Sequence, residues 1–244
     1  MEKTHKAVTG GSSPLASYQD VMLGNRSLVA LLYYEWCLLL GPIPGMLGLA
    51  LRKVFWPRLF ASCGSKCVFA AGIVLRQPGR IQLGKSVVIS EGCVLDARHG
   101  HAGVSMSLGD NVILSNNVML SCKNGTISIG DNVGLNAQTI VQSTNDCPVI
   151  IGADAVVGQR CFIIGGGSYN IDRLDLPIRE QGIRRDTGVE IGEDVWLGGN
   201  VTVLGGVRMG RGSVAGAGAV VTGPVAEYAV CLGVPAKVVR TRQA

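Results

Sequence analysis

A six-residue periodicity runs through residues 63–239 and limits what this chain can fold into. Seven triplets of mostly aliphatic residues occur there, and the step inside every triplet is six residues. The strands of a β-sandwich alternate with a period of two, so a sustained step of six favours short strands wound into a triangular coil. The triplets are Cys63/Phe69/Leu75, Leu83/Ile89/Leu95, Leu108/Leu114/Leu120, Ile129/Leu135/Val141, Ile151/Val157/Ile163, Ile191/Leu197/Val203 and Met209/Ala215/Val221.

Glycine and small or branched residues occupy fixed positions in this repeat. A glycine follows the first residue of every triplet, and the residue four positions after an aliphatic one is small or branched, such as Cys67, Cys93 or Cys161. Glycine and asparagine tolerate the positive φ that tight corners need, and the branched residues suit the interior of a prism. We therefore expect an all-β fold over residues 63–240, a left-handed parallel β-helix of about seven or eight coils.

The coils differ in length, and the differences fall at one place. The triplets begin at residues 63, 83, 108, 129, 151, 191 and 209, whereas an ideal coil has 18 residues. The extra residues always follow the third strand, which predicts that they all emerge from one corner. The longest insertion spans about residues 165–190, and a loop of that length on a compact solenoid is usually functional.

Two segments precede the repeat. Residues 1–24 begin with a polar, Gly/Ser-rich stretch and are expected to be a flexible tail. Residues 25–62 are expected to be an apolar helical segment, which Pro42 and Pro44 divide into halves too short to span a bilayer. Three alternatives remain: an interfacial anchor with Trp36 and Trp56 near lipid headgroups, a helical lid on the β-helix, or an uncleaved signal-like segment.

Composition narrows the class of function. The net charge is +5 and no basic cluster is interleaved with aromatic residues, so nothing indicates a nucleic-acid partner. A mildly cationic surface suits a phosphorylated cofactor or anionic lipid headgroups. The eight cysteines form no CxxC pair and there are only three histidines, which gives no zinc-ligand spacing. We expect no metal, and reduced, mostly buried cysteines in a cytoplasmic protein, at the inner face of the membrane if residues 25–60 contact lipid.

The C-terminal stretch, residues 188–240, resembles the signature of the hexapeptide-repeat acyltransferases. The similarity runs from IGEDVWLGGNVTVLGGV through GAGAVVT to GVPAKVVR. From Asn25 onward the chain is also similar to O-acetyltransferases of bacterial surface-polysaccharide gene clusters. It shares with them the apolar N-terminal segment, the CKNG turn at residues 122–125 and the loop DRLDLPIREQG at residues 172–182.

This resemblance implies a homotrimer with sites between neighbouring prisms and acetyl-CoA as the acyl donor. It implies that the pantetheine arm lies against Trp196, Gly198, Gly216, Ala217 and Gly218, and that Lys237 and Arg240 contact the coenzyme phosphates. Two simpler interpretations stay open. The glycines could serve only the corner geometry, and the two cations could belong to a solvated basic tail.

The resemblance also implies a histidine in the long loop as general base, but Tyr169 stands at that position. Tyrosine, with a pKa of about 10, is a poor base at pH 7. Asp172, Asp175 and Glu180 in the loop and His99 and His101 in another insertion are the other candidates.

Two functions follow from this pattern. The first is an acetyl-CoA-dependent O-acetyltransferase that acts on a sugar hydroxyl of a small or lipid-linked saccharide in surface-polysaccharide synthesis. The alternative is a catalytically inactive trimer that serves as a scaffold or regulator in polysaccharide assembly.

Overall fold

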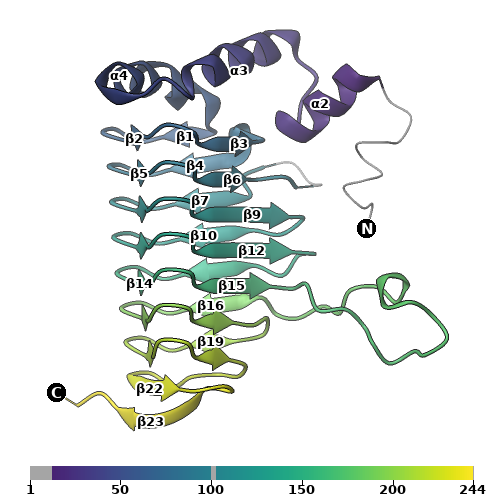
Figure 1. Ribbon diagram of the computed structural model, residues 1–244, viewed down its shortest axis with the longest axis vertical. Coiled ribbons are helices and arrows are strands. Elements are labelled where there is room, and N and C mark those ends of the chain that lie inside the picture. Colours follow the sequence, from purple (N-terminus) through teal and green to yellow (C-terminus); the bar gives the residue numbers. More distant parts are fainter. Residues whose placement is uncertain (1–12, 100–102, 244) are drawn as a thin grey trace.

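The computed structural model describes residues 13–99 and 103–243 as one parallel β-helix with helices across its N-terminal end (Figure 1). Three parallel sheets form its walls. The first sheet contains β1 (Ser62–Cys63), β4 (Ile81–Leu83), β7 (Met106–Leu108), β10 (Ile127–Ile129), β13 (Val149–Ile151), β16 (Val189–Ile191) and β19 (Arg208–Met209). The second contains β2 (Val68–Phe69), β5 (Val88–Ile89), β8 (Ile113–Leu114), β11 (Gly134–Leu135), β14 (Val156–Val157), β17 (Trp196–Leu197), β20 (Val214–Ala215), β22 (Ala229–Leu232) and the antiparallel β23 (Lys237–Thr241). The third contains β3 (Val74–Arg76), β6 (Val94–Asp96), β9 (Met119–Lys123), β12 (Ile140–Thr144), β15 (Phe162–Gly165), β18 (Thr202–Val203) and β21 (Val220–Val221).

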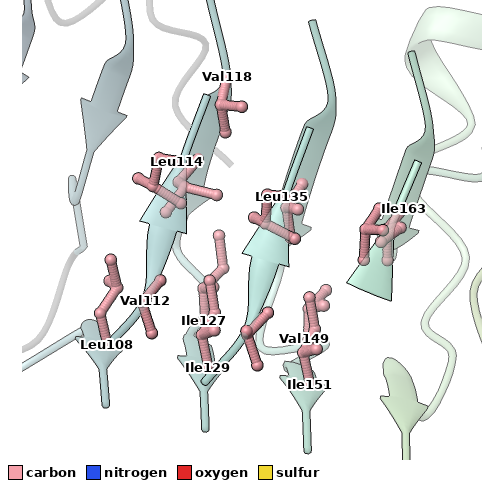
Figure 2. Packing of buried hydrophobic residues seen from close by; sticks show 14 of the residues in the cluster. Leu108, Val112, Leu114, Val118, Ile127, Ile129, Leu135, Val149, Ile151 and Ile163 are labelled. Carbon is pink, nitrogen blue, oxygen red and sulfur yellow. The ribbon is translucent and has the colours of Figure 1, made fainter. Parts of the chain in front are cut away.

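The register of the sheets confirms the repeat. Ile129 pairs with Leu108 on one side and with Ile151 on the other, so equivalent members of successive triplets lie above one another. Their side chains stack in columns inside the prism, as Figure 2 shows for Leu108, Ile129 and Ile151. Cys67, Cys93 and Cys161 are buried in this core, and all eight cysteines are free. The predicted parallel β-helix is therefore correct.

The repeated glycine has a different purpose from the one that the sequence suggested. Asn111 and Asn132 do take positive φ at the corner between the first and second sheets, at 57° and 58°. None of the seven repeated glycines does, and the expectation for them is wrong. A Cβ on Gly152 would lie 2.7 Å from the amide nitrogen of Glu193 in the next coil. Glycine is needed here because the backbones of successive coils approach too closely for any side chain.

The insertions leave the corner between the third and first sheets. One of them contains the short 3-10 helix η2 (Pro78–Arg80). The longest follows β15 and projects from the prism as an extended arm, which includes η3 (Ile178–Glu180) (Figure 1). We call residues 166–188 the arm.

Helices cover the first coil. They are α2 (Pro14–Met22), α3 (Leu28–Leu40), α4 (Gly45–Phe55) and η1 (Trp56–Leu59). Residues 14–22 were expected in the flexible tail but form α2, because the Ser13 hydroxyl accepts a hydrogen bond from the Ala16 amide and Pro14 begins the helix. None of the helices in residues 13–99 and 103–243 has the length and apolar character needed to cross a membrane.

Buried polar contacts fix the helices to the coil, and we call residues 14–61 the cap. The Arg52 guanidinium is 1% exposed and donates to the carbonyl oxygens of Phe69, Leu40, Gly41 and Ile43 at 2.8–3.1 Å. The Tyr34 hydroxyl donates to the Leu75 carbonyl at 2.7 Å. The Trp56 and Phe60 rings pack on Phe69 of β2. The inner surface of the cap thus closes the end of the β-helix, as one of the three alternatives for this segment proposed.

The close approach at the repeated glycine predicts the effect of adding one methyl group. We expect Gly152→Ala to lower the free energy of unfolding by about 1–3 kcal/mol, because the coils must separate to accept it. Gly134→Ala is the matched control, since nothing lies within 4 Å of its added Cβ. Urea unfolding followed by circular dichroism measures both, and equal stability of the two variants would contradict the interpretation.

The buried guanidinium of the cap makes a second prediction. Arg52→Met should lower the free energy of unfolding by about 3 kcal/mol or more, because four carbonyl oxygens lose a charged donor. The exposed neighbour Lys53 provides the control, and Lys53→Met should change stability by less than about 0.5 kcal/mol. Thermal and urea unfolding of both variants would show the difference, and a neutral Arg52→Met would exclude this role.

Candidate functional site

A groove of about 500 Å³ lies on the C-terminal coils, along the second sheet and its corner with the first. Trp196, Gly216 and Arg240, three of the predicted cofactor residues, line it together. Trp196 lies on the outer face of β17 and is 56% exposed, because the next residue, Leu197, points into the core. The remaining lining residues are Asp154, Val156, Asp194, Val195, Val214, Val230, Leu232 and Arg242.

Two carboxylates mark one edge of the groove. Asp154 and Asp194 occupy equivalent corner positions in successive coils, with φ of 61° and 55°. Asn132 donates its side-chain amide to Asp154 at 2.9 Å, which extends a ladder of polar corner residues toward the groove. The corner geometry therefore aims these short polar side chains outward, along the edge of the second sheet.

The C-terminal hairpin supplies the cations. Strand β23 turns back antiparallel to β22 and sets Arg240 opposite Val230. Arg242, just beyond β23, donates to the Asp194 carboxylate at 3.0 Å and to the Gly212 carbonyl at 2.9 Å. Both partners of this ion pair are substantially exposed, so it contributes little to stability. The groove thus has an aromatic wall and two guanidinium groups at its end.

An irregularity interrupts the pairing of β22 with β23, between Val230 and Cys231. Lys237 and Arg240 lie on either side of this irregularity, whereas Arg240 and Arg242 are two residues apart beyond it, so period-two alternation places these two arginines on one side. Lys237 pairs with Leu232 and does not line the groove. The sequence analysis missed Arg242, although the same alternation, counted from Arg240, would have found it.

The other small residues of the predicted cofactor site lie outside the groove lining. Gly198 is buried, its carbonyl accepts a hydrogen bond from the Cys161 thiol at 3.1 Å, and a Cβ on it would lie 2.6 Å from the Ala217 nitrogen. Ala217 and Gly218 are exposed at the next corner, where Gly218 has φ of 73°. Corner geometry accounts for Gly198 and Gly218 without a ligand.

Backbone and carboxylate contacts order the arm at its base. The Asp186 carboxylate accepts hydrogen bonds from the Gly166 amide at 3.1 Å and the Gly188 amide at 2.7 Å. Tyr169 bridges to Ile183 across the arm, and its side chain is 49% exposed. The Gln181 side chain bonds to the backbone of two residues farther out along the arm. The arm is therefore a folded hairpin-like loop that projects Tyr169 into solvent.

The predicted acid and base candidates are distributed along the same corner. Asp172 is exposed on the arm, while Asp175 and Glu180 are paired with Arg173 and Arg179. The Arg173 guanidinium holds the pKa of the Asp175 carboxyl below its usual value. Asp175 and Glu180 are thus engaged in ion pairs on the surface of the arm.

The second insertion, after β6, contains the histidine candidates. His101 lies outside the described residues, and His99 is partly buried beside Arg98. Arg98 and Arg76 both bond the carboxylate of Asp96, which is fully buried. Among residues 13–99 and 103–243, no three His, Cys, Asp or Glu side chains gather to hold a metal ion.

Within one chain, the arm and the groove lie on opposite sides. The arm leaves the corner between the third and first sheets, and the second sheet is the wall opposite that corner. Figure 1 shows this separation, with the arm projecting to the right and β14 and β22 of the second sheet on the left. The structure therefore brings Trp196, Gly216 and Arg240 together but does not bring Tyr169 or Asp172 to them.

Comparisons with known proteins agree with this architecture. Residues 100–122 and 188–223 match the hexapeptide repeat of succinyl-transferase. Over 80% of the chain, the fold is similar to that of AntD, an N-acyltransferase from Bacillus cereus solved with dTDP and 3-hydroxybutyryl-CoA, with a TM-score of 0.51, 16% identity and 87% of that chain covered. At this identity the likeness concerns the fold alone.

Two curated relatives are more similar in sequence. A probable acetyltransferase of Mycobacterium tuberculosis is 34% identical over 57% of this chain and 45% of its own length. WbbJ of Escherichia coli K12, named for O-acetyl transfer in lipopolysaccharide biosynthesis, is 37% identical over 48% of this chain and 61% of its own length. The chain spans about half the length of the curated relatives it matches. The repeat, the register and these matches together support a relationship to the hexapeptide-repeat acyltransferases.

Proposed function

We propose that this protein is an acetyl-CoA-dependent O-acetyltransferase that acts on a sugar hydroxyl in bacterial surface-polysaccharide synthesis. The groove carries this proposal, because Trp196, Gly216, Arg240 and Arg242 line one surface of suitable size. The name of WbbJ supports O-acetyl transfer to a saccharide, and the acyl-CoA bound to AntD supports a coenzyme A thioester as donor. The cytoplasm, where acetyl-CoA is made, is the compartment that this function requires.

The groove residues fit a coenzyme A thioester by their chemistry. Gly216 has no side chain, and the Leu232 side chain packs into the space that a Cβ would fill, so these two residues together form this edge of the groove. The guanidinium groups of Arg240 and Arg242 are permanently charged, and their paired N–H donors suit phosphate oxygens. The exposed Trp196 ring offers an apolar wall to the pantetheine arm. Acetyl-CoA, when bound, supplies an acetyl group activated as a thioester.

A homotrimer would complete the site. The arm and the groove of one chain face away from each other, so an arm reaches a groove only on a neighbouring copy. Leu174 at the outer part of the arm is 100% exposed, and Ile171 and Ile178 are more than half exposed. These apolar side chains would pack on the neighbouring prism and carry Tyr169 and Asp172 to its groove.

Acetyl transfer to a hydroxyl requires a group that removes the hydroxyl proton as the new C–O bond forms. Tyr169 occupies the position of the family's histidine, and Asp172 follows it on the same arm. The presence of tyrosine there favours a second candidate, a catalytically inactive trimer that acts as a scaffold in polysaccharide assembly. The two candidates differ in whether the unmodified protein transfers acetyl groups.

Substitution of the arginines in the groove tests whether it binds acetyl-CoA. We expect Arg240→Gln to weaken acetyl-CoA binding by about tenfold, because a charged contact to phosphate is lost. Lys237→Gln is the matched control, because Lys237 does not line the groove, and it should change affinity by less than about twofold. Isothermal titration calorimetry measures both. A protein that binds no acetyl-CoA would sink the proposal, and a larger loss in Lys237→Gln would reassign the phosphate contact.

Placing a histidine at position 169 of the arm tests whether this position acts as the general base. If the protein is an enzyme, it transfers acetyl groups to a saccharide acceptor slowly, and Tyr169→His increases kcat by about tenfold or more. That gain should grow as pH rises through about 6.5, because only the neutral imidazole accepts a proton. Ile171→His places the same group nearby on the arm and should give no gain. Activity in Tyr169→His alone, with none in the wild type, would favour the inactive scaffold.

A further inference from the structure

The outer surface of the cap exposes large apolar side chains, although its inner surface is fully packed. Val29 is 78% exposed, Leu32 71% and Met46 86%. An apolar patch of this extent on a soluble protein marks an interaction site. The residues, all on α3 and α4, are Leu28, Val29, Leu32, Trp36, Leu39, Met46, Leu47, Leu49 and Val54.

Helical spacing places these residues on one side of the cap. Leu28, Leu32, Trp36 and Leu39 follow one another at steps of four, four and three, which is one face of α3. The opposite face of α3 carries the buried residues Tyr34, Cys37 and Leu40. Both helices lie across the end of the prism (Figure 1), so the exposed face points away from the coils and from the groove.

Charge around this face is positive. The two carboxylates of the cap are engaged, Asp20 with Arg26 and Glu35 with the Tyr18 hydroxyl at 2.6 Å. Lys53 and Arg58 are exposed beside the apolar residues. Cations that flank an apolar helix face are the pattern that binds an anionic lipid surface, where each cation near the headgroups adds to the attraction.

A hollow of about 530 Å³ at the edge of this face combines the same two properties. Val29, Leu59 and Phe60 contribute apolar walls, and Arg58 and Tyr33 contribute polar groups. A guanidinium beside an apolar wall matches a phospholipid, whose phosphate and acyl chain are joined in one molecule. A protein partner would not need a guanidinium and an apolar wall side by side at the edge of the exposed apolar face.

We propose that the outer face of α3 and α4 docks the protein on an anionic phospholipid bilayer. The helices contain 13 and 11 residues, so they are about 20 Å and 16 Å long and lie within the interface rather than cross a hydrocarbon core of about 30 Å. This inference stands on the cap alone and does not depend on acetyl transfer. The cap would then have two roles: its inner surface closes the β-helix, and its outer surface binds lipid.

Vesicle binding by the purified full-length protein tests the proposal. We expect co-sedimentation with phosphatidylglycerol/phosphatidylcholine vesicles, and weaker binding to pure phosphatidylcholine or at high salt. The double variant Leu32→Ser/Met46→Ser should lower the partition coefficient by about tenfold or more. Lys53→Gln/Arg58→Gln should lose about tenfold on anionic vesicles only. Ile150→Ser, at an exposed aliphatic position of β13, is the control and should bind as the wild type does.

Tryptophan fluorescence gives a local readout. Trp56 is buried and Trp196 lies in the groove, so in a Trp196→Phe protein a vesicle-induced blue shift reports on Trp36. No binding to either vesicle would overturn the proposal. So would binding that the Leu32→Ser/Met46→Ser change leaves intact, provided that circular dichroism shows both proteins folded. Concentration-dependent association in solution that this change abolishes, without vesicle binding, would assign the face to a second copy of the chain.

Discussion

The stacking of one coil directly on the next is the constraint on which the rest of this structure depends. Parallel strands of successive coils pair in all three walls, and the repeated glycine allows their backbones to meet at a corner without a side chain between them. This contact fixes the axial position of every residue in a coil. The groove follows from it, because Trp196 and Gly216 lie in successive coils whose registers are locked.

The ends of such a stack are its weak points, since the terminal strands leave unpaired backbone groups that would invite further pairing. The chain solves this problem differently at its two ends. At the first coil, the Arg52 guanidinium and the Tyr34 hydroxyl satisfy carbonyl oxygens from within a helical cap. At the last coil, β23 folds back antiparallel to β22. The hairpin of β22 and β23 also brings Arg240 to the groove. The same strand therefore ends the stack and contributes a residue to the candidate site.

The strands and their register could be predicted from the sequence, because inward residues such as Leu108, Ile129 and Ile151 repeat at a fixed step. The reason for the glycines could not, because close approach between coils is visible only in three dimensions. The groove was predicted in part: Trp196, Gly216 and Arg240 meet there, whereas Lys237 does not line it. Nothing local in the sequence reports which side of β23 turns toward the groove until the hairpin pairing is known.

The confinement of the insertions to one corner has a consequence for how such a chain can change. Residues added there lengthen a surface loop without shifting the pairing of any strand, so the arm of residues 166–188 can be remodelled while the opposite wall keeps its shape. Within one chain, variation at this corner therefore leaves the shape of the groove across the prism unchanged. A lineage built on this plan can change the length and sequence of the arm and inherit the groove unchanged.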